Sequence, residues 1–190
     1  MRKIGILGGT YNPPHIGHLI IANEVKNALG LDEVRLMPTA LPPHKNADAT
    51  ISPVARLEMV KIAVKATEGL VASSFEIDRG GVSYTVDTMR QLTKEEPDAQ
   101  FYFIIGGDMI DQLHKWYKIE ELLELVSFIG VNRPGWKSET AFPITLVDIP
   151  EIDLSSTLLR ERFKNGNTVK FLIPPEVEAY IVEEGLYGTN

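Results

Sequence analysis

Short apolar runs bounded by Gly, Pro or charged residues recur along the chain and predict β-strands. They lie at Lys3 to Leu7, Glu33 to Pro38, Leu70 to Ile77, Phe101 to Ile105, Ser127 to Val131 and Ile144 to Val147. Apolar residues at helical spacing predict helices at Ile16 to Leu29, Pro53 to Glu68, Tyr84 to Glu95 and Ile119 to Leu125. Because strands and helices alternate, we expect an α/β fold with a parallel sheet covered on both faces.

The last part of the chain has a different character. A Ser-Ser-Thr start precedes a helical stretch at Leu158 to Lys164, and Pro174-Pro175 opens another at Glu176 to Glu184. We therefore expect residues 150–190 to form a small helical C-terminal part. A length of 190 residues with 44% hydrophobic content fits one domain, residues 1–190.

The stretch from Leu41 to Ser52 contains Pro42, Pro43 and scattered polar residues, and it is expected to be a mobile loop.

Composition narrows the kind of protein. A net charge of -7 argues against a general nucleic-acid surface, so an anionic ligand must meet a local basic pocket. The absence of cysteine excludes disulfides, thiolate metal sites and cysteine nucleophiles. The apolar run after Met1-Arg2-Lys3 is too short for a signal peptide, and no stretch approaches the ~20 apolar residues of a membrane span. We expect a soluble, cytoplasmic protein.

The segment Gly8-Gly9-Thr10-Tyr11-Asn12-Pro13-Pro14-His15-Ile16-Gly17-His18 follows the first strand and opens a helix. Open α/β sheets bind ligands at this kind of position. Glycines allow close approach of the backbone to a phosphate, and a helix N-terminus offers free N–H groups to an anion. His15 and His18 are three residues apart and are predicted to project from one helix face.

Other interpretations of this segment agree less well with its residues. The Walker pattern and the G-x-G-x-x-G dinucleotide pattern are both absent. A zinc site would need a third ligand, and only His44 and His114 remain as further imidazoles, so no protein metal site is expected. An ordinary helix cap does not require Gly-Gly, Pro-Pro, His and Gly in one short segment.

The His15-Ile16-Gly17-His18 motif resembles the H-x-G-H signature of the nucleotidyltransferase superfamily, whose Rossmann-like core is shared with class I aminoacyl-tRNA synthetases. The chain lacks the KMSKS-like segment of the synthetases. Three further motifs, in the expected order, resemble bacterial nicotinate mononucleotide adenylyltransferases: Gly81 to Thr88, Ile105 to Met109 and Leu154 to Arg160. Asn12 and Leu154 stand where that family often has Asp and Ile.

The resemblance runs from Ile4 to about Pro175 and implies a reaction. The adenylyl group of ATP is transferred to nicotinate mononucleotide, which gives nicotinate adenine dinucleotide and pyrophosphate in NAD biosynthesis. The attacking phosphate has a second pKa near 6, so it is largely ionised at neutral pH and needs no strong general base. The chemical demand is therefore positioning and fixed positive charge around the phosphates. Mg²⁺ is expected to arrive with ATP, held largely through water.

The resemblance also implies roles for individual residues. His15, His18, Lys45 and Arg160 are the expected catalytic contacts, with His18 at the α-phosphate and Lys45 on a closing loop. The expected ATP-binding residues are Gly8, Gly9, Thr10, Gly106, Asp108, Arg133, Ser155, Ser156 and Thr157. The expected nicotinate-binding residues are Tyr84, Thr85, Trp116 and Tyr117, with backbone N–H groups at the Tyr84-Thr85 helix start facing the carboxylate.

Without the resemblance, several of these residues have plainer interpretations. Lys45 is then a solvated loop lysine, Ser155 an ordinary helix cap, Gly106-Gly107-Asp108 a turn, and Trp116 a core or surface anchor.

Three rival functions remain open from the sequence. A phosphopantetheine adenylyltransferase shares the His15 to His18 motif, but a pantetheine arm has no aromatic ring to stack on Trp116. A non-catalytic nucleotide-binding module needs no second substrate pocket. An NAD-dependent oxidoreductase is disfavoured by the missing dinucleotide fingerprint. The sequence leaves homo-oligomerisation open.

Overall fold

The computed structural model describes residues 1–41, 51–132, 140–150 and 152–189. Within these residues six strands form one sheet in the order β3-β2-β1-β4-β5-β6, and every neighbouring pair is parallel. The strands are β1 (Arg2–Gly9), β2 (Glu33–Pro38), β3 (Leu70–Ala72), β4 (Ala99–Gly106), β5 (Ser127–Asn132) and β6 (Ile144–Asp148). The predicted α/β architecture is confirmed.

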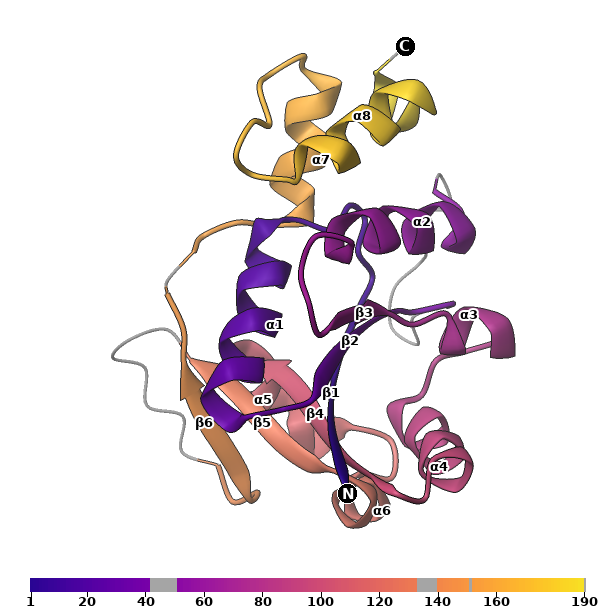
Figure 1. Cartoon of the computed structure of the whole chain (residues 1–190), viewed down its shortest axis with the longest axis vertical. Coiled ribbons are helices and arrows are strands. Elements are labelled where there is room, and N and C mark those ends of the chain that lie inside the picture. Colours follow the sequence, from indigo (N-terminus) through magenta and orange to yellow (C-terminus); the bar gives the residue numbers. More distant parts are fainter. Residues whose placement is uncertain (42–50, 133–139, 151, 190) are drawn as a thin grey trace.

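Helices cover both faces of the sheet (Figure 1). They are α1 (Ile16–Leu29), α2 (Pro53–Val64), α3 (Phe75–Arg79), α4 (Thr85–Glu95), α5 (Gly107–Gln112), α6 (Ile119–Leu125), α7 (Ser156–Lys164) and α8 (Pro175–Glu183), with 3-10 turns η1 (Leu113–Lys115) and η2 (Leu186–Gly188). Alternate residues of β1 and β4 enter different cores. Ile6 and Phe103 pack with α4, α5 and α6, whereas Leu7 and Ile104 pack with α1 and α2.

One predicted strand is wrong in its second half. The run expected at Leu70 to Ile77 is a strand only as far as Ala72, and Phe75–Arg79 is helical. The two serines between them explain the change. The Ser73 hydroxyl accepts the Phe75 N–H at 3.4 Å, and the Ser74 hydroxyl donates to Asp78 at 2.5 Å. Such local bonds compete with the ladder of a sheet and favour a helix start.

The C-terminal helices form a core of their own with α2. Leu159 and Phe163 of α7, and Val177 and Ile181 of α8, pack against Met59 of α2. Figure 1 shows α7 and α8 beyond the end of the sheet at which α1 begins. The expected helical C-terminal part is present, and the assignment of residues 1–190 to one domain stays a prediction.

The strand order indicates where a ligand site is expected. β1 lies between β2 and β4, so successive connections run outward from it in opposite directions. At such a reversal the loops after the two central strands diverge, and open α/β sheets bind ligands beyond the carboxyl ends of those strands, here β1 and β4. Those ends are Gly9 and Gly106, both within the predicted ATP-binding set.

None of the helices in the described ranges combines the length and apolar character that crossing a bilayer requires.

Candidate active site

A buried arginine stabilises the loop after β1. Arg56 of α2 donates to the carbonyl of Thr10 at 2.7 Å and to that of Thr39, after β2, also at 2.7 Å. The Tyr11 hydroxyl donates to the Leu7 carbonyl at 2.5 Å, and Tyr11 has a φ of 51°. A non-glycine residue adopts positive φ only where its surroundings hold it there. The loop therefore has a fixed conformation.

His15 and His18 lie in contact at the start of α1. Their ring centroids are 3.7 Å apart with 27° between the planes, and the Tyr11 ring lies 4.8 Å from that of His18. The backbone N–H of His15 donates to Nδ1 of His18 at 3.1 Å. Because Nδ1 accepts, this bond assigns the proton of the neutral ring to Nε2. His18 thus offers an Nε2–H donor, and the prediction that the two histidines share one face is confirmed.

Both imidazoles are neutral in the ligand-free protein. Burial lowers the pKa of His15 to about 4. Burial also lowers the pKa of His18, and the neighbouring His15 lowers it further. A bound phosphate would act in the opposite direction, because an anion favours the charged ring. Nδ1 of His15 is buried with no hydrogen-bond partner among the described residues.

Gly17 allows this arrangement of the two histidines. A Cβ at position 17 would lie 3.0 Å from Nδ1 and 3.1 Å from Cε1 of His15. A side chain there would displace the His15 ring by a few tenths of an ångström. The space that the His15 ring occupies therefore favours glycine at this position of the motif.

The buried His15 ring makes stability depend on pH. The pKa of His15 falls from 6.5 in the unfolded chain to about 4 in the fold, so between these values the unfolded chain binds more protons. The free energy of unfolding then decreases as the pH falls through this window. When the pH falls from about 7 to about 4.5, we expect the free energy of unfolding to decrease by about 2 kcal/mol less in His15→Asn than in the wild type. This difference follows from about 1.4 kcal/mol per pKa unit. Urea unfolding at both pH values measures this difference. Equal decreases in the free energy of unfolding in the two proteins would contradict the prediction. His114→Asn, at an exposed histidine, is the control.

The start of α7 lies beside the same loop. Ser155 caps α7 by accepting the Leu158 N–H at 3.2 Å, which agrees with the plainer interpretation of this serine. The Ser156 hydroxyl donates to the Pro13 carbonyl at 2.8 Å, and Arg160 donates to the Asn12 carbonyl at 2.8 Å. A second nitrogen of Arg160 donates to Thr157 Oγ1 at 3.1 Å. Residues of the predicted Leu154 to Arg160 motif thus contact the loop that precedes the H-x-G-H segment, more than 140 residues away in sequence.

Arg56 and Arg160 supply positive charge beside the loop. Within the described residues neither guanidinium forms an ion pair with a carboxylate. Arg56 is 4% exposed, and its contacts are backbone carbonyls. An anionic ligand at the loop would meet this charge despite the net charge of -7 of the chain. Arg56 was missed by the sequence reasoning, although a lone arginine among the apolar positions of α2 was a usable signal.

The predicted adenosine residues follow β4. Gly106 precedes α5 as its N-cap residue, and Asp108 lies exposed in the first turn. A Cβ on Gly106 would be 3.1 Å from Oδ1 of Asp108, so the carboxylate is turned back over the glycine. Since β4 pairs with β1, this carboxylate lies at the same end of the sheet as Gly8, Gly9 and Thr10.

The predicted nicotinate residues lie around the start of α4. Tyr84 is the N-cap residue, Thr85 the first helical residue, and the Tyr84 ring lies 4.9 Å from that of Tyr117. Trp116 is half-buried and packs edge-on against Phe103 at 5.9 Å and Phe128 at 6.1 Å. Trp116 therefore acts as an anchor to the core as well as a candidate wall, whereas Tyr117 is 52% exposed.

A short bridge joins this region to the end of β2. Leu41 pairs with Val82, the Ser83 N–H donates to the Leu41 carbonyl at 3.0 Å, and the Ser83 hydroxyl accepts the Ala40 N–H at 3.2 Å. The bridge thereby fixes the start of α4, with Tyr84, at the carboxyl end of the sheet.

Two predicted contacts, Lys45 and Arg133, lie outside the described residues, as do Pro42, Pro43 and most of the predicted mobile loop.

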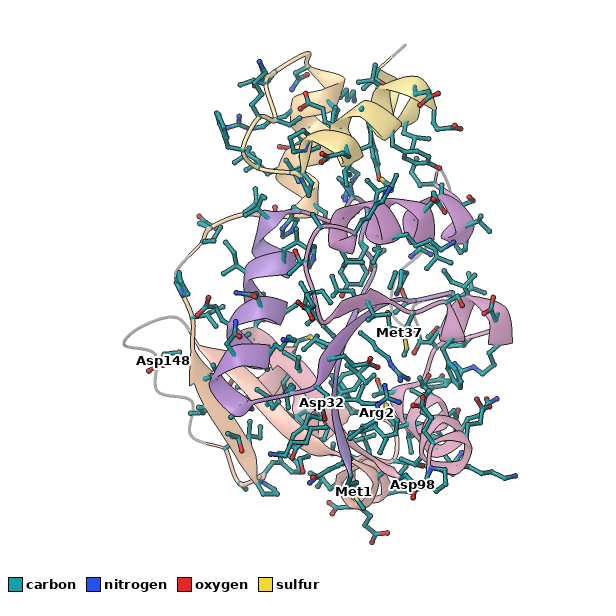
Figure 2. The ribbon with its side chains drawn as sticks, in the orientation of Figure 1. Met1, Arg2, Asp32, Met37, Asp98 and Asp148 are labelled. Atoms are coloured by element: carbon teal, nitrogen blue, oxygen red, sulfur yellow. The ribbon has the colours of Figure 1, made fainter. Side chains whose placement is uncertain are left out.

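One cavity lies at the amino ends of the strands, opposite the end of the sheet that carries this site. It has a volume of about 470 Å³ and is lined by Met1, Arg2 and residues 95–99. These residues precede or begin β1 and β4, and Figure 2 shows Met1, Arg2 and Asp98 at the end of the molecule away from α7 and α8.

The described part of the chain contains no group of three His, Asp or Glu side chains placed to hold a metal ion. The donors of the site, imidazole and guanidinium, suit phosphate oxygens instead. This donor set fits a metal ion that arrives bound to a nucleotide.

Comparison with known proteins agrees with this geometry. The cytidylyltransferase-like family model matches residues 6–162. A protein of Bacillus anthracis named "Probable nicotinate-nucleotide adenylyltransferase" is 56% identical over 187 residues, covering 98% of this chain and 99% of the relative, and one of Bacillus thuringiensis matches equally well. The chain belongs to the nicotinate-nucleotide adenylyltransferase family. It is therefore a nucleotidyltransferase.

A solved structure supports the fold of this adenylyltransferase. The nicotinic acid mononucleotide adenylyltransferase of Plasmodium falciparum, in complex with NaAD, superposes with a TM-score of 0.82 at 21% identity, covering 100% of this chain and 99% of the other. At that identity the likeness concerns the fold alone. It shows the Rossmann-like nucleotidyltransferase fold that the sequence predicted.

Proposed function

We propose that this adenylyltransferase joins ATP and nicotinate mononucleotide at the carboxyl ends of β1 and β4. A phosphate oxygen of the mononucleotide attacks the α-phosphorus of ATP. The bond between that phosphorus and the oxygen bridging to the β-phosphate breaks, and pyrophosphate leaves with its electron pair. The products are nicotinate adenine dinucleotide and pyrophosphate, a step of NAD biosynthesis.

One observation carries the assignment of this reaction to the site. The stacked histidine pair and the start of α7 converge on one loop, with Arg56 and Arg160 both bonded to its carbonyls. Two anions must be brought together in this reaction, and fixed donors and cations offset their repulsion. The attacking phosphate is already ionised, so the site needs no strong base. The lowered pKa values of His15 and His18 fit donors that are neutral before substrate binds.

We assign roles along the path of the phosphates. The Nε2–H of His18 donates to the α-phosphate, with His15 beside it. Gly8, Gly9 and Thr10 allow the nucleotide close to the backbone, and Ser155, Ser156, Thr157 and Arg160 receive the β- and γ-phosphates. Gly106 and Asp108 face the adenosine ribose, and Arg133 contacts phosphate or adenosine. Tyr84, Thr85, Trp116 and Tyr117 surround the nicotinate ring.

Mg²⁺ is the metal we propose for the nucleotide. It would be held by the ATP phosphates and water rather than by a cage of carboxylates. Bound there, it would neutralise charge on the phosphates.

Lys45 is proposed to reach the phosphates when its loop closes over ATP. A charged contact made on closure should lower both the KM for ATP and the barrier. We expect Lys45→Ala to raise the KM for ATP and to reduce kcat. Together these changes should lower kcat/KM about tenfold or more. Steady-state rates at varied ATP measure this, and Lys65→Ala, at the C-cap of α2, is a control outside the site. Unchanged kinetics would mean that Lys45 is a solvated loop residue that does not contact the phosphates.

Product analysis tests the function directly. The protein is incubated with ATP, Mg²⁺ and either nicotinate mononucleotide or phosphopantetheine, and the adenylylated product is identified by mass spectrometry. The expected product is nicotinate adenine dinucleotide. Adenylylated phosphopantetheine would instead identify the protein as a phosphopantetheine adenylyltransferase. The paired Tyr84 and Tyr117 rings disfavour that function, because pantetheine has no ring to stack on them.

Further features of the protein stay predictions. We propose that it is a single-domain, cytoplasmic enzyme that does not bind nucleic acid. Homo-oligomerisation remains compatible with the chain.

A further inference from the structure

The C-terminal end of the chain reaches the loop that carries the histidines. The Tyr187 hydroxyl of η2 donates to Oδ1 of Asn12 at 2.5 Å, across 175 residues of sequence. The Tyr187 ring is stacked on Phe163 of α7, with centroids 5.8 Å apart and 20° between the planes. Chain termini are usually poorly ordered unless they are tied down. The described end of this chain is tied to the candidate active site.

The conformation of this end is specific. Tyr187 has a φ of 56°, which a tyrosine adopts only where contacts hold it. Thr189 adds two bonds, donating to the carbonyls of Ile181 at 3.2 Å and Leu186 at 2.9 Å. These contacts fold residues 185–189 back against α8, which directs the Tyr187 hydroxyl toward Asn12.

Asn12 is the point at which these contacts meet. Its side-chain oxygen accepts from Tyr187, and its backbone oxygen accepts from Arg160 at 2.8 Å. The next residue, Pro13, accepts from Ser156. Asn12 is 7% exposed, so its oxygen would lack a replacement partner if Tyr187 lost its hydroxyl. Burial raises the pKa of Tyr187, so the hydroxyl keeps its proton and remains a donor at any ordinary pH.

We propose that Tyr187 is a positioning residue for catalysis, which acts through Asn12 to fix the loop from Thr10 to His15. Two residues, Pro13 and Pro14, separate Asn12 from His15, and the loop sets where α1 begins. A shift of the loop moves the stacked histidines relative to the phosphates, and small misplacements of catalytic groups are costly in rate. The proposal rests on the adenylyl-transfer function proposed above.

The test compares two tyrosine variants after wild-type product formation has been verified. Tyr187→Phe removes the hydroxyl and keeps the ring on Phe163. Tyr180→Phe on α8 is the matched control, because the Tyr180 hydroxyl forms no hydrogen bond within the described residues. We expect kcat to fall about tenfold in Tyr187→Phe, the KM for nicotinate mononucleotide to stay within about twofold, and Tyr180→Phe to match the wild type. All rates are compared about 20 °C below the lowest melting temperature, so that each variant is folded.

A double-mutant cycle separates positioning from a general effect on folding. Asn12→Asp keeps an acceptor oxygen, so Tyr187→Phe should again cost about tenfold in that background. Asn12→Ala removes the acceptor, so adding Tyr187→Phe should then change kcat less than about twofold. Wild-type kcat in Tyr187→Phe, an equal loss in Tyr180→Phe, or additive losses with Asn12→Ala would each overturn the proposal. A wild-type protein that forms no nicotinate adenine dinucleotide would instead overturn the proposed function.

Discussion

Replacing His18 by Ala is expected to lower kcat by about 100- to 1,000-fold, with a much smaller effect on nucleotide binding. Removing one preorganised donor to charge that develops in the transition state commonly costs ~2.7 to 4 kcal/mol. The bond from the His15 N–H holds the His18 ring with Nε2 free to donate, so the donor is in place before substrate arrives. An interaction that strengthens in the transition state affects turnover more than binding.

Two variants sharpen this experiment. His18→Gln retains a side-chain N–H donor and should recover part of the lost rate. His114→Ala removes an exposed imidazole from η1 and should keep wild-type turnover. Rates at saturating ATP and nicotinate mononucleotide are compared with ATP affinity measured by calorimetry. Near-normal turnover in His18→Ala, or a loss confined to affinity, would remove His18 from the α-phosphate.

Periodicity was sufficient for most of the fold, because both faces of the sheet are buried. The central strands are continuous apolar runs, and each lies where the pattern predicted it. The failure at Leu70 to Ile77 has a local cause. Ser73 accepts a backbone N–H and Ser74 donates to the Asp78 side chain, and a count of apolar residues does not register such bonds.

The candidate site was predictable where its residues are close in sequence. His18 lies in the first turn of α1 and His15 is the N-cap residue of that helix, and Ser155 is a cap recognisable from its residue type. Contacts made by distant residues carry no such signal. Tyr187 reaches Asn12 only because α7 and α8 pack on α2, so its place depends on tertiary packing.

Selectivity for nicotinate over nicotinamide mononucleotide is the second large effect that we expect, at least ~100-fold in kcat/KM. The start of α4 provides the reason. The Tyr84 carbonyl accepts from the N–H groups of Asp87 and Thr88, whereas the preceding amides of Thr85 and Val86 have no acceptor within the helix. Tyr84 also provides no side-chain cap. These N–H groups, at the positive end of the helix, suit a carboxylate.

A carboxamide cannot satisfy the same donors. A carboxylate accepts from every N–H directed at it, but a carboxamide turns an NH₂ group toward at least one of them. An unsatisfied buried donor costs ~1 to 3 kcal/mol, and the loss of a charge-assisted bond adds to this. The carboxylate of Asp87 in the same turn is paired with Arg90 at 2.7 Å, which limits its repulsion of the ligand. Steady-state kcat/KM for the two mononucleotides at identical ATP and Mg²⁺ measures the discrimination. Equal values would mean that the start of α4 does not recognise the carboxylate, and would place the protein among adenylyltransferases of dual specificity.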